Sequence, residues 1–282
     1  MATLGELKKR LSSIRMTGQM AGAMKTASAA KFARISGGLS RFEGYAAACR
    51  DVTERFGDAL TTVYPPADPA APRCFVLLGS NRGLCGGYNM TLYEYADRIL
   101  REAGEYRLVA VGRHAVNRYR ELGFPLAGEF VLPDTASPDD AAPVFEAVKK
   151  MYLAGEVSSV EILWQRFVNM LNQEPSRRRL LPVPAGEAGR TASGGGDADG
   201  MLWVPDRACV LRAAADVCLG ADFSACMLEA AAGSQAATLV AMRAAYDNAE
   251  ESSAGLEADI AHQRQSEVTA SVIETSGGNA RR

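Results

Sequence analysis

Two long segments, one near each end of the chain, carry apolar residues in alternating steps of three and four. The first series is Phe32, Ile35, Leu39, Phe42, Ala46, Cys49, Thr53, Phe56 and Leu60. The second series is Leu228, Ala232, Gln235, Leu239, Met242, Tyr246, Ala249, Ser253, Leu256 and Ile260. A sustained repeat of 3.5 residues is typical of the seam of a left-handed coiled coil. The pattern therefore predicts two long helices that pack against each other.

The distribution of proline supports these two helices. All twelve prolines lie between Pro65 and Pro205, so both ends of the chain are free of proline. Proline interrupts a helix because it removes a backbone donor and clashes with the preceding turn. Helices of about 60–75 residues would span roughly 90–115 Å, which predicts a rod rather than a globular core.

Between these ends, short apolar runs alternate with helical stretches. Strands are predicted at Arg73–Ser80, Tyr106–Gly112, Glu129–Leu132 and Val157–Phe167. Helices are predicted at Thr91–Ala103, in a stretch that ends at Leu122, and from Asp139 to Ala154. This alternation indicates a mostly parallel sheet with helices on its faces. The glycine-rich residues 185–200 are predicted to be a flexible loop at a hairpin tip.

The predicted fold class is therefore α/β. Two long terminal helices form an antiparallel coiled coil, and an α/β domain of mostly parallel sheet is inserted between them. The expected domains are an N-terminal helix over residues 1–64, the α/β domain over 65–204 and a C-terminal helix over 205–282.

Composition and charge argue against nucleic acid and membrane lipid as direct partners. A hydrophobic content of 48% with 23% charged residues is typical of a folded soluble chain. The net charge of -2 gives no general reason to expect nucleic acid or anionic lipid. The aromatic residues of the basic N-terminal helix follow the seam rather than interleaving for base stacking, so we expect no nucleic acid. No apolar run of about 18 residues predicts a membrane span, and we expect a cytoplasmic chain.

Residues that commonly carry chemistry are sparse. The six cysteines show no Cys-x-x-Cys spacing, and the only histidines are His114 and His262, which does not favour a metal site. Surface or capping roles are predicted for both histidines. No Ser-His-Asp, Cys-His or paired-carboxylate pattern stands out. We therefore expect no catalytic residue, no bound cofactor and no metal.

One glycine-rich loop follows a predicted strand and opens a helix, where phosphate-binding loops usually lie. Its sequence, GSNRGLCGGYN over residues 79–89, lacks the Lys-Ser/Thr pair of a P-loop and does not match G-x-G-x-x-G. A tight contact turn is favoured, in which Gly86 or Gly87 needs positive φ, Leu84 packs inward and Arg82 is exposed. A nucleotide-binding α/β enzyme with coiled-coil arms is the alternative, and a structural coiled-coil tether is a second.

The same loop carries a resemblance to a known family. SNRGLCGGYN resembles S-D-[KR]-G-L-C-G-G-[FY]-N, the signature of the gamma subunits of F-type rotary ATP synthases, and differs mainly at Asn81. Residues 6–35 resemble the opening helix of that family. Residues 234–269 resemble its closing helix, with A-M-x-x-A-x-x-N-A and R-Q-x-x-[IV]-T preserved. The resemblance covers essentially the whole chain.

The resemblance implies a non-catalytic central shaft that couples ion flow to ATP synthesis or hydrolysis in a hexamer of alpha and beta subunits. The α/β domain would form a foot with the epsilon subunit on the membrane ring of c subunits. The chain would then be peripheral, on the cytoplasmic face of the cell membrane, and would reach the membrane only through its partners. The implied partner contacts are Arg15, Thr17, Met24, Lys31, Arg82, Gly83, Leu84, Cys85, Gly86, Gly87, Asn248, Arg264, Gln265 and Thr269.

Several positions depart from the family pattern. The family's Lys-Ile-Thr-Lys is replaced by the residues at 19–22, its arginine in the closing helix by Thr238, and its apolar tail by the polar residues 277–282. Ile260-Ala261 replaces Tyr-Asn. These departures suggest a divergent branch with altered coupling, such as a second synthase or an ion-pumping relative. The coupled ion, proton or sodium, is set in the membrane ring, and both directions of the reaction stay open.

Overall fold

The computed structural model describes residues 3–183 and 203–279. The loop expected at residues 185–200 lies outside the described residues, as does the end of the polar tail. The chain forms two compact units, one of residues 1–28 with 239–282 and one of residues 29–238. Two unbroken helices, α1 (Leu4–Leu60) and α5 (Arg207–Asn279), contribute to both units. The two long helices predicted from the absence of proline are confirmed.

The second unit contains a five-stranded sheet in the order β3-β2-β1-β4-β5. Its strands are β1 (Arg73–Leu78), β2 (Tyr106–Val111), β3 (Leu126–Phe130), β4 (Ser159–Phe167) and β5 (Gln173–Leu181). β1 pairs in parallel with both β2 and β4, and β2 pairs in parallel with β3. β5 pairs antiparallel with β4. The prediction of a mostly parallel sheet is confirmed.

Two strands differ from the sequence-based expectation. β5 was not predicted, because its sequence QEPSRRRLL holds a proline and three arginines instead of an apolar alternation. An edge strand tolerates this composition, since one side of its backbone needs no sheet partner. β3 begins and ends earlier than the predicted Glu129–Leu132. It is also an edge strand and alternates between half-buried and exposed residues, so its apolar signal is weak.

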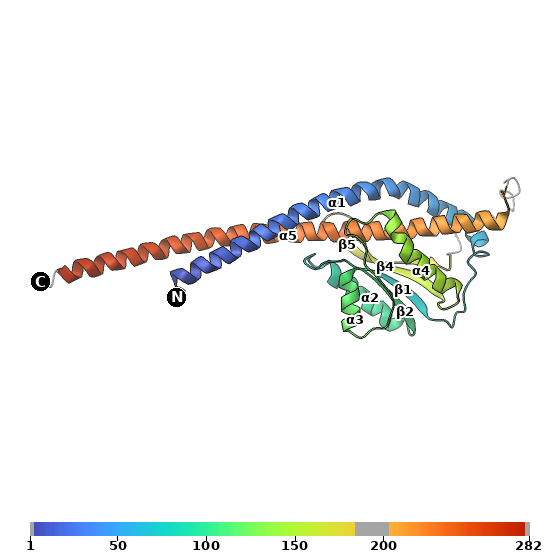
Figure 1. Ribbon diagram of the computed structural model, residues 1–282, viewed down its shortest axis with the longest axis horizontal. Helices are drawn as coiled ribbons and strands as arrows, with labels where there is room; N and C mark the ends of the chain where they lie inside the picture. Colours follow the sequence, from blue (N-terminus) through green and yellow to red (C-terminus); the bar gives the residue numbers. More distant parts are fainter. Residues whose placement is uncertain (1–2, 184–202, 280–282) are drawn as a thin grey trace. The chain divides into compact units, whose positions relative to one another are not determined.

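Helices cover both faces of the sheet (Figure 1). On one face, α2 (Tyr88–Glu102) and α3 (Arg113–Glu121) pack on Phe75, Leu77 and Leu108. On the other face, α4 (Ala142–Leu153) and α5 pack on β-strand residues such as Ile162 and Trp164. The short 3-10 helix η1 (Pro138–Ala141) leads into α4. The residues at both interfaces are buried and apolar, so burial of apolar surface holds the three layers together.

The two long helices pack together within each unit. In the second unit, Cys49 of α1 lies with Cys218 and Ala221 of α5. Every residue of the two predicted seam series is buried or half-buried, as a packed helix face requires. Phe32 at the start of the first series packs on Phe167 of β4. None of the described helices is both long and apolar enough to cross a membrane.

In the first unit, the contacts between α1 and α5 run in opposite directions along the two helices. A β-carbon at Gly22 would lie 3.1 Å from the ring of Tyr246, and one at Gly18 would lie 3.1 Å from the β-carbon of Ala249. Further toward the start of α1, Arg15 forms an ion pair with Glu257. Positions that decrease along α1 meet positions that increase along α5, so this pairing is antiparallel.

Candidate functional site

The glycine loop, residues 79–87, connects the end of β1 to the start of α2. β1 lies between two parallel neighbours, β2 and β4, whose helices lie on opposite faces of the sheet. Doubly wound sheets bind ligands at such a point, beyond the carboxyl ends of the strands. The loop passes very close to the turn between β2 and α3. A β-carbon at Gly79 would lie 2.8 Å from that of Ala115, and one at Gly112 would lie 2.3 Å from the carbonyl oxygen of Gly79. Two glycines therefore permit this close crossing.

The buried side chain of Asn89 supports the loop from inside. Its Nδ2 donates to Ser80 Oγ at 2.8 Å, and its Oδ1 accepts from the Ser80 amide at 3.3 Å. Ser80 Oγ in turn donates to the carbonyl oxygen of Arg82 at 2.6 Å. The Cys85 thiol is buried beside the same amide, with Asn89 Nδ2 at 3.3 Å from Sγ. Burial raises the pKa of Cys85, so this thiol stays protonated and shapes the loop rather than acting as a nucleophile.

The backbone of the loop confirms one prediction and overturns another. Gly86 has φ +58°, as predicted for one of the two adjacent glycines, whereas Gly87 has φ −79°. Leu84 was predicted to pack inward, and this is wrong, because 63% of its surface is exposed. Its own φ is +60°, a left-handed conformation that carries its side chain outward while the neighbouring Cys85 occupies the interior.

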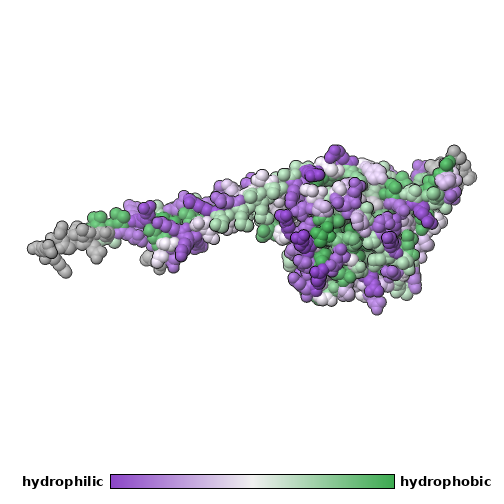
Figure 2. All heavy atoms as spheres, viewed as in Figure 1, coloured by the Kyte–Doolittle hydropathy of each residue, from purple (hydrophilic) through white to green (hydrophobic). Residues whose placement is uncertain are grey.

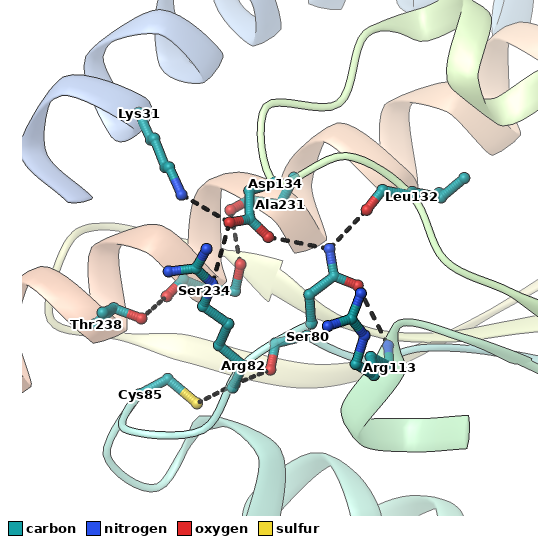
Figure 3. Close-up of polar contacts among 11 residues, drawn as sticks. Lys31, Ser80, Arg82, Cys85, Arg113, Leu132, Asp134, Ala231, Ser234 and Thr238 are labelled. Atoms are coloured by element: carbon teal, nitrogen blue, oxygen red, sulfur yellow. Dashed lines mark hydrogen bonds and ion pairs between the residues drawn. The ribbon is translucent and has the colours of Figure 1, made fainter. Parts of the chain in front are cut away.

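A carboxylate that sequence reasoning missed lies beside the loop (Figure 3). Asp134 Oδ2 lies 2.6 Å from Lys31 Nζ and 3.5 Å from Arg82 Nε. Asp134 Oδ1 accepts a hydrogen bond from Asn81 Nδ2 at 3.0 Å. Burial acts to raise the pKa of Asp134, but the hydrogen bonds from Lys31 and Asn81 and the charges of Lys31 and Arg82 outweigh it and lower the pKa.

The predicted contacts of the second unit gather around this carboxylate and the loop. Lys31 and Arg82 share Asp134, and 70% of the Arg82 side chain is exposed. Gly83, Gly86 and Gly87 are exposed as well. Cys85 is a correction, since its buried side chain offers no contact surface to a partner.

The predicted contacts of the first unit lie on α1 and α5. Arg15 forms its ion pair with Glu257, and Met24 is half-buried. Arg15 is exposed, and so are the remaining members of this set, Thr17, Asn248, Arg264, Gln265 and Thr269. The two threonine hydroxyls donate to carbonyl oxygens of their own helices, which leaves their side chains on the surface.

Two positions that depart from the family pattern, Gly22 and Thr238, have visible structural consequences. Gly22 makes room for the ring of Tyr246, and a longer side chain would collide with that ring. Lys25 Nζ lies 4.2 Å from the centroid of the same ring. Thr238 Oγ1 donates to the carbonyl oxygen of Ser234 at 2.7 Å, so it extends no charged group to the surface.

The two histidines have the ordinary surface roles predicted for them. His114 is exposed at the start of α3, with Nδ1 3.0 Å from the hydroxyl of Tyr93. His262 is exposed on α5.

Comparisons with known proteins agree with this geometry. A solved mitochondrial ATP synthase of Euglena gracilis, containing OSCP, F1 and the c-ring, has a chain with a TM-score of 0.67 at 16% identity, covering 98% of this chain and 93% of that one. A mitochondrial ATP synthase structure from Tetrahymena thermophila, of the central stalk and c-ring, has a chain with a TM-score of 0.59 at 19% identity. The match covers 80% of this chain and 99% of that one. At these identities the likeness shows the fold. The shared fold is an α/β domain that lies, in sequence, between two long terminal helices.

The sequence comparisons identify the family. The model described as ATP synthase matches residues 3–280. The ATP synthase gamma chain of Desulforudis audaxviator is 30% identical over 293 residues, covering 99% of each chain. That of Desulforamulus reducens is 28% identical over 284 residues, again covering 99% of each. The chain belongs to the family of ATP synthase gamma chains.

Proposed function

We propose that this chain is the central rotor shaft of an F-type ATP synthase. It turns inside a hexamer of alpha and beta subunits and couples transmembrane ion flow to ATP synthesis or hydrolysis, while the nucleotide chemistry takes place on those subunits. The observation that carries the proposal is the match of both terminal helices and the α/β domain, over nearly the full chain, to gamma chains.

The packing of the first unit suits a narrow shaft that resists twisting. Glycines at positions 18 and 22 bring α1 and α5 so close that a β-carbon at either position would lie 3.1 Å from a side chain of the other helix. The Arg15–Glu257 ion pair joins the two helices further along. Two helices in close contact resist relative rotation because packed side chains leave few voids into which they could shift.

Exposed apolar side chains on the two helices support an enclosing partner. They are Met16 and Met20 on α1, with Val268, Val272 and Ile273 on α5, each 61% to 66% exposed. Figure 2 shows the apolar colour near the C-terminal end of the described chain. On each helix these side chains stand within one or two turns of one another, and exposed apolar patches often mark contact with another protein. We propose that the alpha and beta subunits surround these residues.

The α/β domain, residues 65–204, is proposed as the foot, and residues 1–64 and 205–282 as the shaft. The foot contacts the epsilon subunit and the ring of c subunits, so the chain is peripheral on the cytoplasmic face of the cell membrane. Arg82, exposed at the tip of the glycine loop, is proposed to meet an acidic surface of the beta subunits. The exposed residues Gly83, Gly86 and Gly87 let that surface approach the backbone closely.

The nucleotide-binding alternative is weaker at the same loop. Arg82 lies 3.5 Å from the carboxylate of Asp134, which would repel a phosphate placed there. Residues 79–87 contain no lysine that could reach a terminal phosphate. The family match also favours the shaft.

The proposal is tested by reconstitution with the alpha and beta subunits of the same organism. We expect the pure chain to hydrolyse no ATP and to bind Mg-ATP no tighter than the millimolar range by calorimetry. We expect it to co-purify with alpha and beta subunits and to raise their ATP hydrolysis. Micromolar binding of Mg-ATP to the pure chain, or no assembly with the two subunits, would contradict the proposal.

A further inference from the structure

We propose that Asp134 is a positioning residue for the glycine loop, and that Asn81 is its matched partner. Asp134 fixes Arg82 of the loop against Lys31 of α1, so that the exposed guanidinium keeps a set direction relative to the helix beside it. The consequence for coupling rests on the proposed function, whereas the pairing of Asn81 with Asp134 does not.

Asp134 joins three segments that are distant in sequence. It lies between β3 and η1, whereas Lys31 belongs to α1 and Arg82 to the loop after β1. The side chains of Lys31 and Asp134 are only 28% and 19% exposed, so solvent screens this 2.6 Å pair less than a surface pair. The carboxylate is therefore a fixed point between the helix and the loop.

The side chain at position 81 must be a hydrogen-bond donor because two acceptors face it. Asn81 Nδ2 donates to the carbonyl oxygen of Leu132 at 2.6 Å and to Asp134 Oδ1 at 3.0 Å. Asn81 Oδ1 accepts from the Arg113 amide at 3.2 Å. An aspartate at position 81 would place a carboxylate oxygen against both acceptors, which is repulsive. The amide at this position, where the family signature has aspartate, thus follows from the negative charge at Asp134.

The contact leaves Arg82 available to a partner. Asp134 engages Nε, and the side chain is 70% exposed, so the terminal amino groups Nη1 and Nη2 can face outward. A long exposed arginine otherwise samples many rotamers, and ordering it on binding costs free energy. The contact at Nε restrains the side chain and so reduces the free energy needed to order it. It also leaves the Nη1 and Nη2 donors directed toward an acidic surface of a partner.

A matched pair of variants tests the positioning role. Asp134→Asn removes the charge at the loop. Asp97→Asn removes a carboxylate of nearly equal exposure, 18%. It pairs with Arg118 at 3.0 Å and accepts from the Tyr119 hydroxyl at 2.7 Å, between α2 and α3. Each is expected to lower the melting midpoint of the full chain by about 2–5 °C. In the assembled complex, only Asp134→Asn should lower the ratio of transported ions to hydrolysed ATP, and Asp134→Glu should restore part of it.

Two results would overturn the positioning role. One is an unchanged ratio in the Asp134→Asn complex. The other is an equal change in the Asp97→Asn complex, which would trace the effect to lost stability alone.

A double-mutant cycle on the isolated full chain tests the pair independently of any complex. Asn81→Asp should lower the melting midpoint in the parent. In the Asp134→Asn background it should lower it by less than half as much, because one of the two facing negative charges is gone. Additive effects would overturn the pairing. If even the parent fails to assemble with alpha and beta subunits, the proposed function fails while this cycle still gives its answer.

Discussion

Cys49 of α1 and Cys218 of α5 lie side by side in the seam of the second unit. Both thiols are buried, and burial, followed by the neighbouring thiol of Cys49, raises the pKa of Cys218 to about 11. The contact joins the two predicted helices at positions far apart in the sequence. This pair is a native probe of the contact between α1 and α5.

A short homobifunctional thiol reagent should link Cys49 to Cys218 within one chain. Because the thiolate is the reactive form, the rate of linkage should rise as the pH increases toward 11. Peptide mapping by mass spectrometry identifies the linked pair. Cys218→Ser is the control and should give no link. The exposed Cys209 should react with monofunctional thiol reagents much faster than Cys49 or Cys218. Links only between chains would mean that the seam is intermolecular.

The adjacent glycines of the loop should respond differently to the same substitution. Gly86→Ala should destabilise the chain by about 1–2 kcal/mol, because Gly86 has φ +58° and side chains disfavour that region. Gly87→Ala should have little effect, because Gly87 has φ −79° and no atom within 4 Å of the added carbon. Urea denaturation of both variants measures the difference. Equal losses would show that the left-handed backbone at Gly86 does not matter.

Stability should depend on the ionisation of Asp134. Its folded-state pKa is lowered below 3.8, so its contribution is present above the unfolded-state pKa and is lost as pH falls through the folded value. The parent should therefore be more stable than Asp134→Asn at neutral pH, and the difference should shrink as the pH falls below about 4. Denaturation of both proteins across this range checks the prediction. A difference that is independent of pH would assign the effect to something other than the charge.

The close approach of the helices in the first unit should be sensitive to added volume. Gly22→Val should destabilise the chain by about 1–3 kcal/mol, because the β-carbon alone would lie 3.1 Å from the Tyr246 ring. Gly37→Val introduces the same side chain into α1 at a position with no atom within 4 Å, and it should be neutral or slightly stabilising. Thermal melting compares the two. Similar losses would indicate that valine is harmful to α1 wherever it stands.

Much of the fold could be read from the sequence because helical period and proline placement act locally. The seam from Phe32 to Leu60 and the strand at β1 follow from such local patterns. β5 does not, because Pro175 and its arginines are tolerated only through pairing with β4, a contact that no local pattern shows.

The candidate site was less predictable than the fold, because its contacts join residues that are distant in the sequence. Arg82 and Gly86 were found because the loop sequence is distinctive. Asp134 was missed, since it lies 103 residues from Lys31 in sequence and only the fold brings the two together. An apolar residue such as Leu84 is expected to pack inward, but its left-handed backbone, with φ +60°, directs the side chain toward solvent.

Rotation of this chain as a shaft can be observed directly. Cys209 is exposed while the other five cysteines are buried, so it can carry a single optical probe. The labelled chain is assembled with immobilised alpha and beta subunits, and the probe is followed in a microscope after addition of Mg-ATP. We expect the probe to rotate in one direction and to stop when ATP is removed. ATP hydrolysis by the complex with a stationary probe would contradict this expectation.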